Sequence, residues 1–106
     1  MQELQVNKEN YFSVLMAVYK KEQPLFFKEA LRSVFEQSLI PNEVVLVKDG
    51  PLTEELEQVI ADFSSKNEQL KIITLEKNQG LGEALRIGLN ACSFDLVARM
   101  DSDDIC

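Results

Sequence analysis

The stretch EVVLVKDGP, residues 43–51, decides how the rest of the sequence is interpreted. It carries a run of apolar, mostly β-branched residues and ends abruptly in Asp-Gly-Pro, which is typical of a tight turn. A strand that is apolar at nearly every position is covered on both faces, as in a parallel sheet with helices on each side. The stretch therefore predicts a buried strand whose carboxyl end reaches Asp49.

Three further apolar runs have the length of strands: FSVLMAV at 12–18, LKIITL at 70–75 and FDLVARM at 94–100. The first is almost continuously apolar, so it also predicts a strand that is buried on both faces. The other two alternate more between apolar and polar residues, which favours positions nearer the edges of a sheet.

Helical patterns separate these strands, and each shows apolar residues repeating at helical spacing. Pro24 suits a first helical turn, Thr53 is a suitable N-cap, and Gly88 is expected where a helix packs closely on the sheet. The expected helices with their buried stripes are 24–38 with Phe27, Leu31, Val34 and Phe35, 53–66 with Leu56, Val59, Ile60 and Phe63, and 81–92 with Leu81, Leu85 and Leu89.

Regular alternation of strands and helices predicts an α/β fold, namely a Rossmann-like three-layer domain with a mainly parallel sheet of four strands (β-α-β-α-β-α-β) and right-handed crossovers. In such sheets, ligands bind beyond the carboxyl ends of the strands. The candidate binding residues are therefore in the segments that follow the strands, which read YKK, KDGP, EKNQG and DSDD.

The length, hydrophobic content and net charge of the chain restrict the classes of function that it can have. The chain has 106 residues, enough for one small domain, and its 45% hydrophobic content is sufficient for a core. A net charge of −7 argues against a broad nucleic-acid-binding face. It does not exclude a small anionic ligand, because a divalent metal can invert the local charge.

The histidine and cysteine content and the apolar runs exclude particular catalytic sites, zinc sites and membrane spans. The sequence contains no histidine, which removes His-dependent catalytic triads. Its two cysteines make neither a disulfide framework nor a zinc site and favour a reducing, cytoplasmic compartment. No apolar run reaches the ~20 residues of a membrane span. Residues 1–11 are polar and are expected to be a flexible N-terminal segment.

The first three strand ends each allow two interpretations. Tyr19 could stack on a flat base or pack under a loop. Asp49 could belong to an ordinary turn or accept hydrogen bonds from a ligand N–H. Gly80 and Gly82 open a helix whose N-terminus suits an anion, but Leu85 occupies the third glycine position and breaks the dinucleotide-binding fingerprint.

The fourth strand ends in the acidic run DSDD, residues 101–104. Asp101 and Asp103 point the same way along an extended chain, where their like charges repel. A solvated acidic loop or the N-cap of a further helix would be a bland explanation. The position at the ligand-binding edge instead favours a metal site, because carboxylate oxygens suit Mg²⁺ or Mn²⁺.

These segments together resemble the N-terminal, nucleotide-sugar-binding half of family 2 glycosyltransferases of the GT-A fold. The resemblance lies in FSVLMAVYK, ALRSVFEQSLIPNEVVLVKDG, NQGLGEALRIGLNAC and DLVARMDSDDI, whose order and spacing are those of the family, and covers nearly all of the chain after Phe12. It implies an inverting transfer of a sugar from a nucleotide-diphosphate sugar, most often a UDP-sugar, to an acceptor in bacterial polysaccharide or glycoconjugate synthesis.

The resemblance also implies roles for individual residues. Tyr19 would pack on the base, Asp49 would contact the polar edge of the base, and Gly80 with its loop would lie beside the nucleotide. Asp103 would be the direct ligand of a divalent metal, Mn or Mg. Asp101 would lie near both the ribose and the metal.

Three positions depart from the family pattern. Lys48 stands where the family often has a first acid before the turn glycine, which weakens the implied recognition of the base. Lys20 replaces an Asn that often follows the first-strand Tyr, and Leu85 replaces an Arg that is common in the third helix.

The resemblance implies that the general base and the acceptor site lie beyond Cys106. Residues 12–106 are then expected to be the donor half of a truncated GT-A fold, inactive alone, with the site for a saccharide or lipid-linked acceptor absent. We further expect a homodimer through the exposed edge of the sheet, and a cytoplasmic location, peripheral to the inner membrane face in the full-length protein.

Two alternatives to a glycosyltransferase stay open at this point. A nucleotidyltransferase also combines an α/β sheet with acidic metal ligands, but AVYKKEQP lacks the Gly-rich phosphate loop that such enzymes place after the first strand. A non-catalytic module that binds a nucleotide or a protein is the other alternative.

Overall fold

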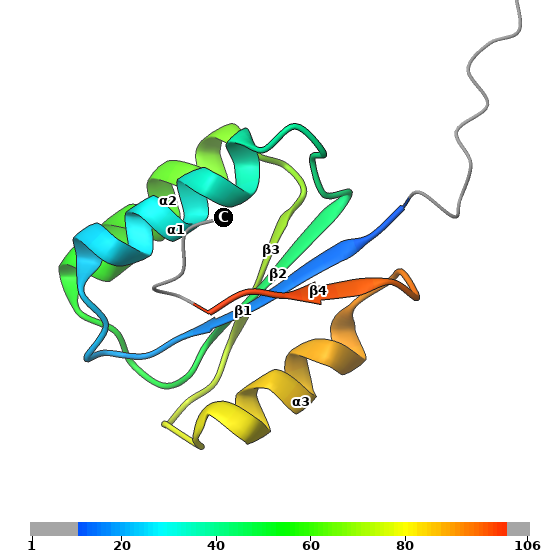
Figure 1. Ribbon diagram of the computed structural model, residues 1–106. Helices are drawn as coiled ribbons and strands as arrows, with labels where there is room; N and C mark the ends of the chain where they lie inside the picture. The colour runs from blue at the N-terminus through cyan, green and yellow to red at the C-terminus, as the bar shows by residue number, and fades with distance from the viewer. Residues whose placement is uncertain (1–10, 102–106) are drawn as a thin grey trace, which may run out of the picture.

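A four-stranded parallel sheet forms the middle layer of residues 11–101, the part of the chain that the computed structural model describes (Figure 1). Strands and helices alternate along the chain as the sequence predicts. The elements are β1 (Ser13–Val18), α1 (Pro24–Glu36), β2 (Glu43–Lys48), α2 (Glu54–Lys66), β3 (Leu70–Thr74), α3 (Leu81–Ala91) and β4 (Val97–Arg99).

The strand order is β3-β2-β1-β4, and every pair of neighbours is parallel. β1 and β2 pair along their whole length, from Ser13 beside Glu43 to Val18 beside Lys48. These two central strands are the continuously apolar ones, while the more alternating β3 and β4 lie at the edges. The predicted α/β fold and the predicted edge positions are therefore confirmed.

Helices α1 and α2 cover one face of the sheet and α3 covers the other (Figure 1). From β1 the chain moves outward through β2 to β3, and then returns past β1 to β4. Crossovers of one hand that run in opposite directions place their helices on opposite faces, which gives three layers. The reversal occurs between β1 and β4, and ligands of open α/β sheets bind beyond the carboxyl ends of the strands at such a point.

Two apolar cores flank the sheet. The larger lies under α1 and α2, whose predicted stripes supply the buried residues Phe27, Leu31, Val34, Leu56 and Ile60 and the half-buried Phe35, Val59 and Phe63. The smaller lies under α3 and is formed by Leu15, Ala17, Val45, Val47 and Ala84. Because alternate residues of β1 and β2 enter opposite cores, both strands need an apolar residue at nearly every position.

The helix ends follow the sequence signals. Pro24 begins α1 in its first turn. The Thr53 hydroxyl caps α2 by accepting a hydrogen bond from the backbone N–H of Leu56 at 3.2 Å. Cys92 caps the C-terminal end of α3, where its N–H donates to the carbonyl of Leu89.

The buried stripe predicted for α3 is wrong at Leu81 and Leu89, whereas Leu85 is half-buried and packs against the smaller core. Leu81 and Leu89 are each 52% exposed, whereas Ala84 and Gly88 form the buried face. A Cβ at Gly88 would lie 2.4 Å from Leu15 Cδ1 and 2.7 Å from Val47 Cγ2. The helix therefore lies so close to the sheet that only small residues fit directly beneath it, and Leu81 and Leu89 are displaced from the contact. The close packing expected at Gly88 is confirmed.

The strand β4 is shorter than its apolar run suggests. Residues 94–96 form a bend before it, in which the Leu96 carbonyl accepts a hydrogen bond from Ser13 N and the Phe94 ring meets the Tyr11 ring edge-on. Among the strands of residues 11–101, β4 pairs only with β1, and its residues Ala98 and Arg99 are exposed. In the stretch from 11 to 101, no helix combines the length and the apolar character needed to cross a bilayer.

Candidate functional site

A cavity of about 420 Å³ opens at the carboxyl edge of the sheet, where the strand order reverses. The ends of β1 and β4 form one side of it, and the loop before α3 and the first turns of that helix form the other. The lining residues are Ala17, Val18, Tyr19, Glu22, Asp49, Asn78, Gly80, Leu81, Leu85, Met100 and Asp101.

Four residues that the sequence singles out line this one cavity: Tyr19, Asp49, Gly80 and Asp101. They come from four separate segments of the chain, and the parallel sheet brings those segments to a common edge. The fifth, Asp103, lies outside the described residues, as does the flexible segment expected for most of residues 1–11.

Tyr19 follows β1 directly and is 39% exposed at the cavity wall. It belongs to neither apolar core, so the interpretation that its ring packs under a loop as core material is not what the structure has. An exposed ring beside a cavity offers a flat apolar surface on which a base could stack.

Asp49 is only 4% exposed, and its carboxylate is held by the loop that precedes α3. Oδ1 accepts a hydrogen bond from the backbone N–H of Gln79 at 2.7 Å, and Oδ2 accepts one from Gly80 at 3.1 Å. The Asn78 side chain donates in addition to the Asp49 carbonyl at 3.2 Å. Asp49 thus fastens the end of β2 to the cavity loop, a role that neither interpretation of the Asp-Gly-Pro turn includes.

Gly50 explains why a glycine follows Asp49. Its φ is +91°, and a Cβ there would lie 2.7 Å from the backbone nitrogen of Asn78. Any other residue would push away the loop that Asp49 binds. Gly80 also has a positive φ, +96°, at the N-cap of α3.

Asp101 lines the cavity just after β4. Its side chain is exposed and its Oδ1 accepts a hydrogen bond from Arg99 at 3.2 Å. The preceding residue, Met100, is tied to β1 by a backbone hydrogen bond to the carbonyl of Leu15. Asp101 is therefore a carboxylate on a fixed strand end.

The described part of the chain contains no group of three or more acidic, cysteine or histidine side chains that could hold a metal ion. Three carboxylates do line the cavity, those of Glu22, Asp49 and Asp101. Oxygen ligands of this kind suit Mg²⁺ or Mn²⁺, which take few protein ligands and share the others with phosphate. The donor chemistry at Asp101 thus fits the expected metal, with Asp103 two residues further along.

Sequence reasoning missed Glu22 and the apolar wall of the cavity. The sequence places Leu81 and Leu85 in the expected stripe of a helix and not at a binding site, yet both line the cavity with Met100. Glu22 lies in the polar segment YKKEQP, whose composition has no periodicity that would single it out. Lys48, by contrast, is not a lining residue and pairs with Glu57 on α2 at 2.8 Å.

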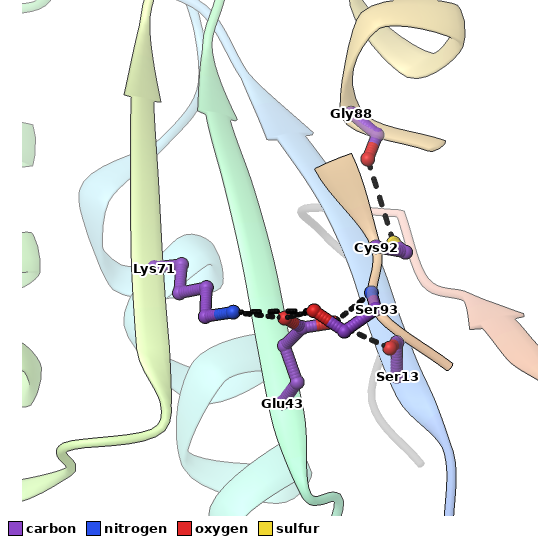
Figure 2. Close-up of polar contacts among 6 residues, drawn as sticks. All are labelled: Ser13, Glu43, Lys71, Gly88, Cys92 and Ser93. Atoms are coloured by element: carbon purple, nitrogen blue, oxygen red, sulfur yellow. Dashed lines mark hydrogen bonds and ion pairs between the residues drawn. The ribbon is translucent and has the colours of Figure 1, made fainter. Parts of the chain in front are cut away.

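A second polar cluster lies at the opposite, amino edge of the sheet (Figure 2). The buried carboxylate of Glu43, 2% exposed, accepts hydrogen bonds from the Ser13 hydroxyl at 2.6 Å, from Ser93 N at 2.7 Å and from the Ser93 hydroxyl at 2.9 Å. Lys71 donates to the same carboxylate. The cluster joins β1, β2, β3 and the residue after the C-cap of α3.

Burial alone would raise the pKa of Glu43, but the hydrogen bonds from Lys71, Ser13 and Ser93 outweigh it and lower this pKa to about 2. The neighbouring Cys92 thiol, which donates to the carbonyl of Gly88, has its pKa raised by burial and by the negative charge of Glu43. A thiol with a raised pKa is a poor nucleophile. This edge of the sheet is therefore structural in character.

Comparison with known proteins gives one family. The family model described as Glycosyl transferase family 2 matches residues 13–106. The chain is 53% identical over 94 residues to the UDP-Gal:alpha-D-GlcNAc-diphosphoundecaprenol beta-1,3-galactosyltransferase of Escherichia coli, covering 89% of this chain and 34% of that protein. It is 47% identical over 95 residues to the amylovoran biosynthesis glycosyltransferase AmsE of Erwinia amylovora, covering 90% of this chain and 35% of that protein.

Solved structures show the same relationship. The structure of S. aureus TarS 1–349 in complex with UDP superposes with a TM-score of 0.75 at 31% identity, covering 90% of this chain and 28% of that one. A mannosyltransferase from Pyrobaculum calidifontis, solved with GDP-Man and Mn²⁺, gives a TM-score of 0.75 at 20% identity over 89% of this chain and 28% of that one, which shows the fold alone. The chain spans about a third of the length of the curated relatives it matches.

Proposed function

The chain belongs to glycosyltransferase family 2, and we propose that it forms the donor-binding part of an inverting glycosyltransferase that takes its sugar from a nucleotide-diphosphate sugar. The observation that carries this proposal is the convergence of Tyr19, Asp49, Gly80 and Asp101 on one cavity at the carboxyl edge of the sheet. Residues 12–106 would then be the donor half of the catalytic domain.

In this proposal the Tyr19 ring packs on the base of the donor. Asp49 holds the Gly80 loop against the nucleotide through the two hydrogen bonds described above. Each carboxylate oxygen has a second lone pair, so Asp49 can also accept from the polar edge of the base. UDP is the favoured nucleotide, because a relative that is 53% identical is named for UDP-Gal and a structural neighbour was solved with UDP.

Asp101 and Asp103 would hold a divalent cation, Mn²⁺ or Mg²⁺, beside the diphosphate. When bound, that ion supplies positive charge against the departing diphosphate. The end of β4 is held by the Met100 hydrogen bond to β1, which gives Asp101 a defined position in the lining of the cavity. Without a cation the cavity is lined by three carboxylates and would repel a diphosphate.

The proposed reaction forms a bond between an acceptor hydroxyl oxygen and the anomeric carbon, on the side opposite the leaving nucleoside diphosphate. The hydroxyl proton passes to a general base, which we place beyond Cys106 together with the acceptor site. A saccharide or lipid-linked acceptor in bacterial polysaccharide synthesis is favoured by the names of the relatives. We also propose a cytoplasmic location and a homodimer through the edge of the sheet at β4.

Titration calorimetry tests the donor site. We expect the chain to bind UDP in the presence of Mn²⁺ and to lose most of the heat in the Asp103→Ala variant. Asp62→Ala, an exposed acid on α2, is the matched control and should bind like wild type. Equal heats from wild type and Asp103→Ala would contradict the metal assignment, and no heat from wild type with UDP or GDP would contradict the donor site.

A further inference from the structure

We propose that Arg99 competes with the divalent cation for Asp101, and so limits how tightly the nucleotide-free site binds that cation. The inference rests on the proposed donor site. It adds a positioning residue to that site, because Arg99 acts through Asp101. Its starting point is the ion pair at the end of β4, in which Arg99 Nη2 lies 3.2 Å from Asp101 Oδ1.

The end of β4 places these two side chains on the same face of the sheet. Side chains alternate between the two faces along an extended chain, so residues 99 and 101 share a face. Arg99 pairs in register with Leu15, which belongs to the core under α3. Met100, between the two charged residues, packs into the opposite core. The ion pair therefore lies on the α3 side, where Asp101 lines the cavity.

The charged side chains that line the cavity are all acidic. They belong to Glu22, Asp49 and Asp101, and the lining that residues 11–101 form contains no lysine or arginine. Asp49 accepts its hydrogen bonds from uncharged backbone N–H groups. Asp101 differs because its partner is a guanidinium, which is always protonated in proteins. Arg99 therefore supplies, beside Asp101, the positive charge that a bound cation would bring.

The cation and the guanidinium repel each other when both lie beside one carboxylate. Each therefore lowers the affinity of Asp101 for the other. The side chains of the pair are 56% exposed at Arg99 and 49% exposed at Asp101, and exposed ion pairs are weak. Arg99 thus lowers the affinity for the cation by a few fold and does not prevent its binding. A diphosphate offsets this loss, because its oxygens are further ligands for the cation.

Mn²⁺ titrations followed by electron paramagnetic resonance measure this competition. We would titrate wild type, Arg99→Ala, Arg99→Lys and Arg32→Ala without nucleotide. Arg32 is the matched control, because it is an exposed arginine that pairs with Glu29 on α1, does not line the cavity, and takes away the same charge when replaced. Arg99→Ala should bind Mn²⁺ about threefold more tightly than wild type. Arg32→Ala should bind it like wild type, and Arg99→Lys, which keeps the charge, should lie closer to wild type than Arg99→Ala does.

Unchanged or weaker Mn²⁺ binding by Arg99→Ala would overturn the inference, since weaker binding would mean that Arg99 holds Asp101 in place for the cation. An equal gain in Arg32→Ala would also overturn it, because net charge alone would then be responsible. Calorimetry of the same proteins with UDP and Mn²⁺ separates these results from failure of the donor site. UDP binding by all four would leave the donor site standing, whereas wild type that binds neither Mn²⁺ nor UDP would overturn the donor site and this inference with it.

Discussion

The carboxylate of Asp49 accepts a hydrogen bond from the backbone N–H of Gly80 at 3.1 Å, and so joins the end of β2 to the N-cap of α3. A second bond, from Gln79, completes the attachment. Asp49 and the loop before α3 are therefore one connected unit in the cavity wall, although Asp49 and Gly80 lie about thirty positions apart in the sequence.

Removing this carboxylate should loosen the loop. We expect Asp49→Ala to lower the free energy of unfolding by about 3 kcal/mol, because two backbone N–H groups lose a charged partner. Asp49→Asn keeps one acceptor oxygen and should lose about half as much. Urea unfolding of the three proteins measures these differences, and an Asp49→Ala variant as stable as wild type would show that the loop does not depend on this contact.

The Glu43 cluster predicts a pH dependence of stability. Because the pKa of Glu43 falls from its ordinary 4.5 to about 2 on folding, its contribution is fully present above pH 4.5 and is lost as the pH falls towards 2. This shift corresponds to about 3 kcal/mol. The charged carboxylate should therefore stabilise the fold at neutral pH and progressively less in acid.

Unfolding curves between pH 6 and pH 2 would check this by comparing wild type with Glu43→Gln. The variant should be less stable at pH 6, and the two proteins should converge in acid because the neutral amide carries no proton linkage. Parallel curves over the whole range would mean that another group is responsible for the acid sensitivity.

The close contact between α3 and the sheet predicts opposite effects on stability for alanine substitutions at two glycines of this helix. Gly88→Ala should destabilise the protein, because its Cβ would collide with Leu15 and Val47, and overpacking of this kind costs about 1–3 kcal/mol. Gly82→Ala lies in the same helix with nothing within 4 Å of the added Cβ. It should stabilise the protein by up to about 1 kcal/mol through helix propensity.

Thermal unfolding of both variants measures whether each substitution raises or lowers the stability of the protein. The account of α3 as a closely packed helix requires the two substitutions to differ in sign. Equal stabilisation by both alanines would show that α3 has room to move away from the sheet.

Tyr19 provides a test of base stacking. Tyr19→Ala should weaken UDP binding about tenfold or more, since a base stacked on an aromatic ring gains about 1–3 kcal/mol. Tyr19→Phe keeps the ring and should bind almost as well as wild type. If Phe and Ala weaken binding equally, the hydroxyl rather than the ring makes the contact.

The fold was predictable where burial determines residue type. Continuous apolar runs placed β1 and β2 at the centre, and the more alternating runs placed β3 and β4 at the edges. The stripe on α3 was not predictable from apolar spacing. Helical spacing favours the leucines at 81, 85 and 89, and only the close approach of Leu15 to Gly88 shows that the small residues face inward.

The candidate site was predictable in outline but not in its contacts. Parallel strands bring their carboxyl ends together, so Tyr19, Asp49, Gly80 and Asp101 could be grouped without coordinates. Which oxygens are already bonded depends on three-dimensional geometry. The engagement of Asp49 by the backbone of Gln79 and Gly80 is therefore visible only in the structure.

The central claim is that the carboxyl edge of the sheet binds a nucleotide with a divalent cation, and paramagnetic broadening by Mn²⁺ tests it most directly. In amide NMR spectra of the chain with UDP, substoichiometric Mn²⁺ should broaden the signals of Tyr19, Gly80 and Asp101 first, and should leave Ser93 at the opposite edge sharp. Uniform broadening, or broadening centred on the acidic first turn of α2 at Glu54 and Glu55, would contradict the account.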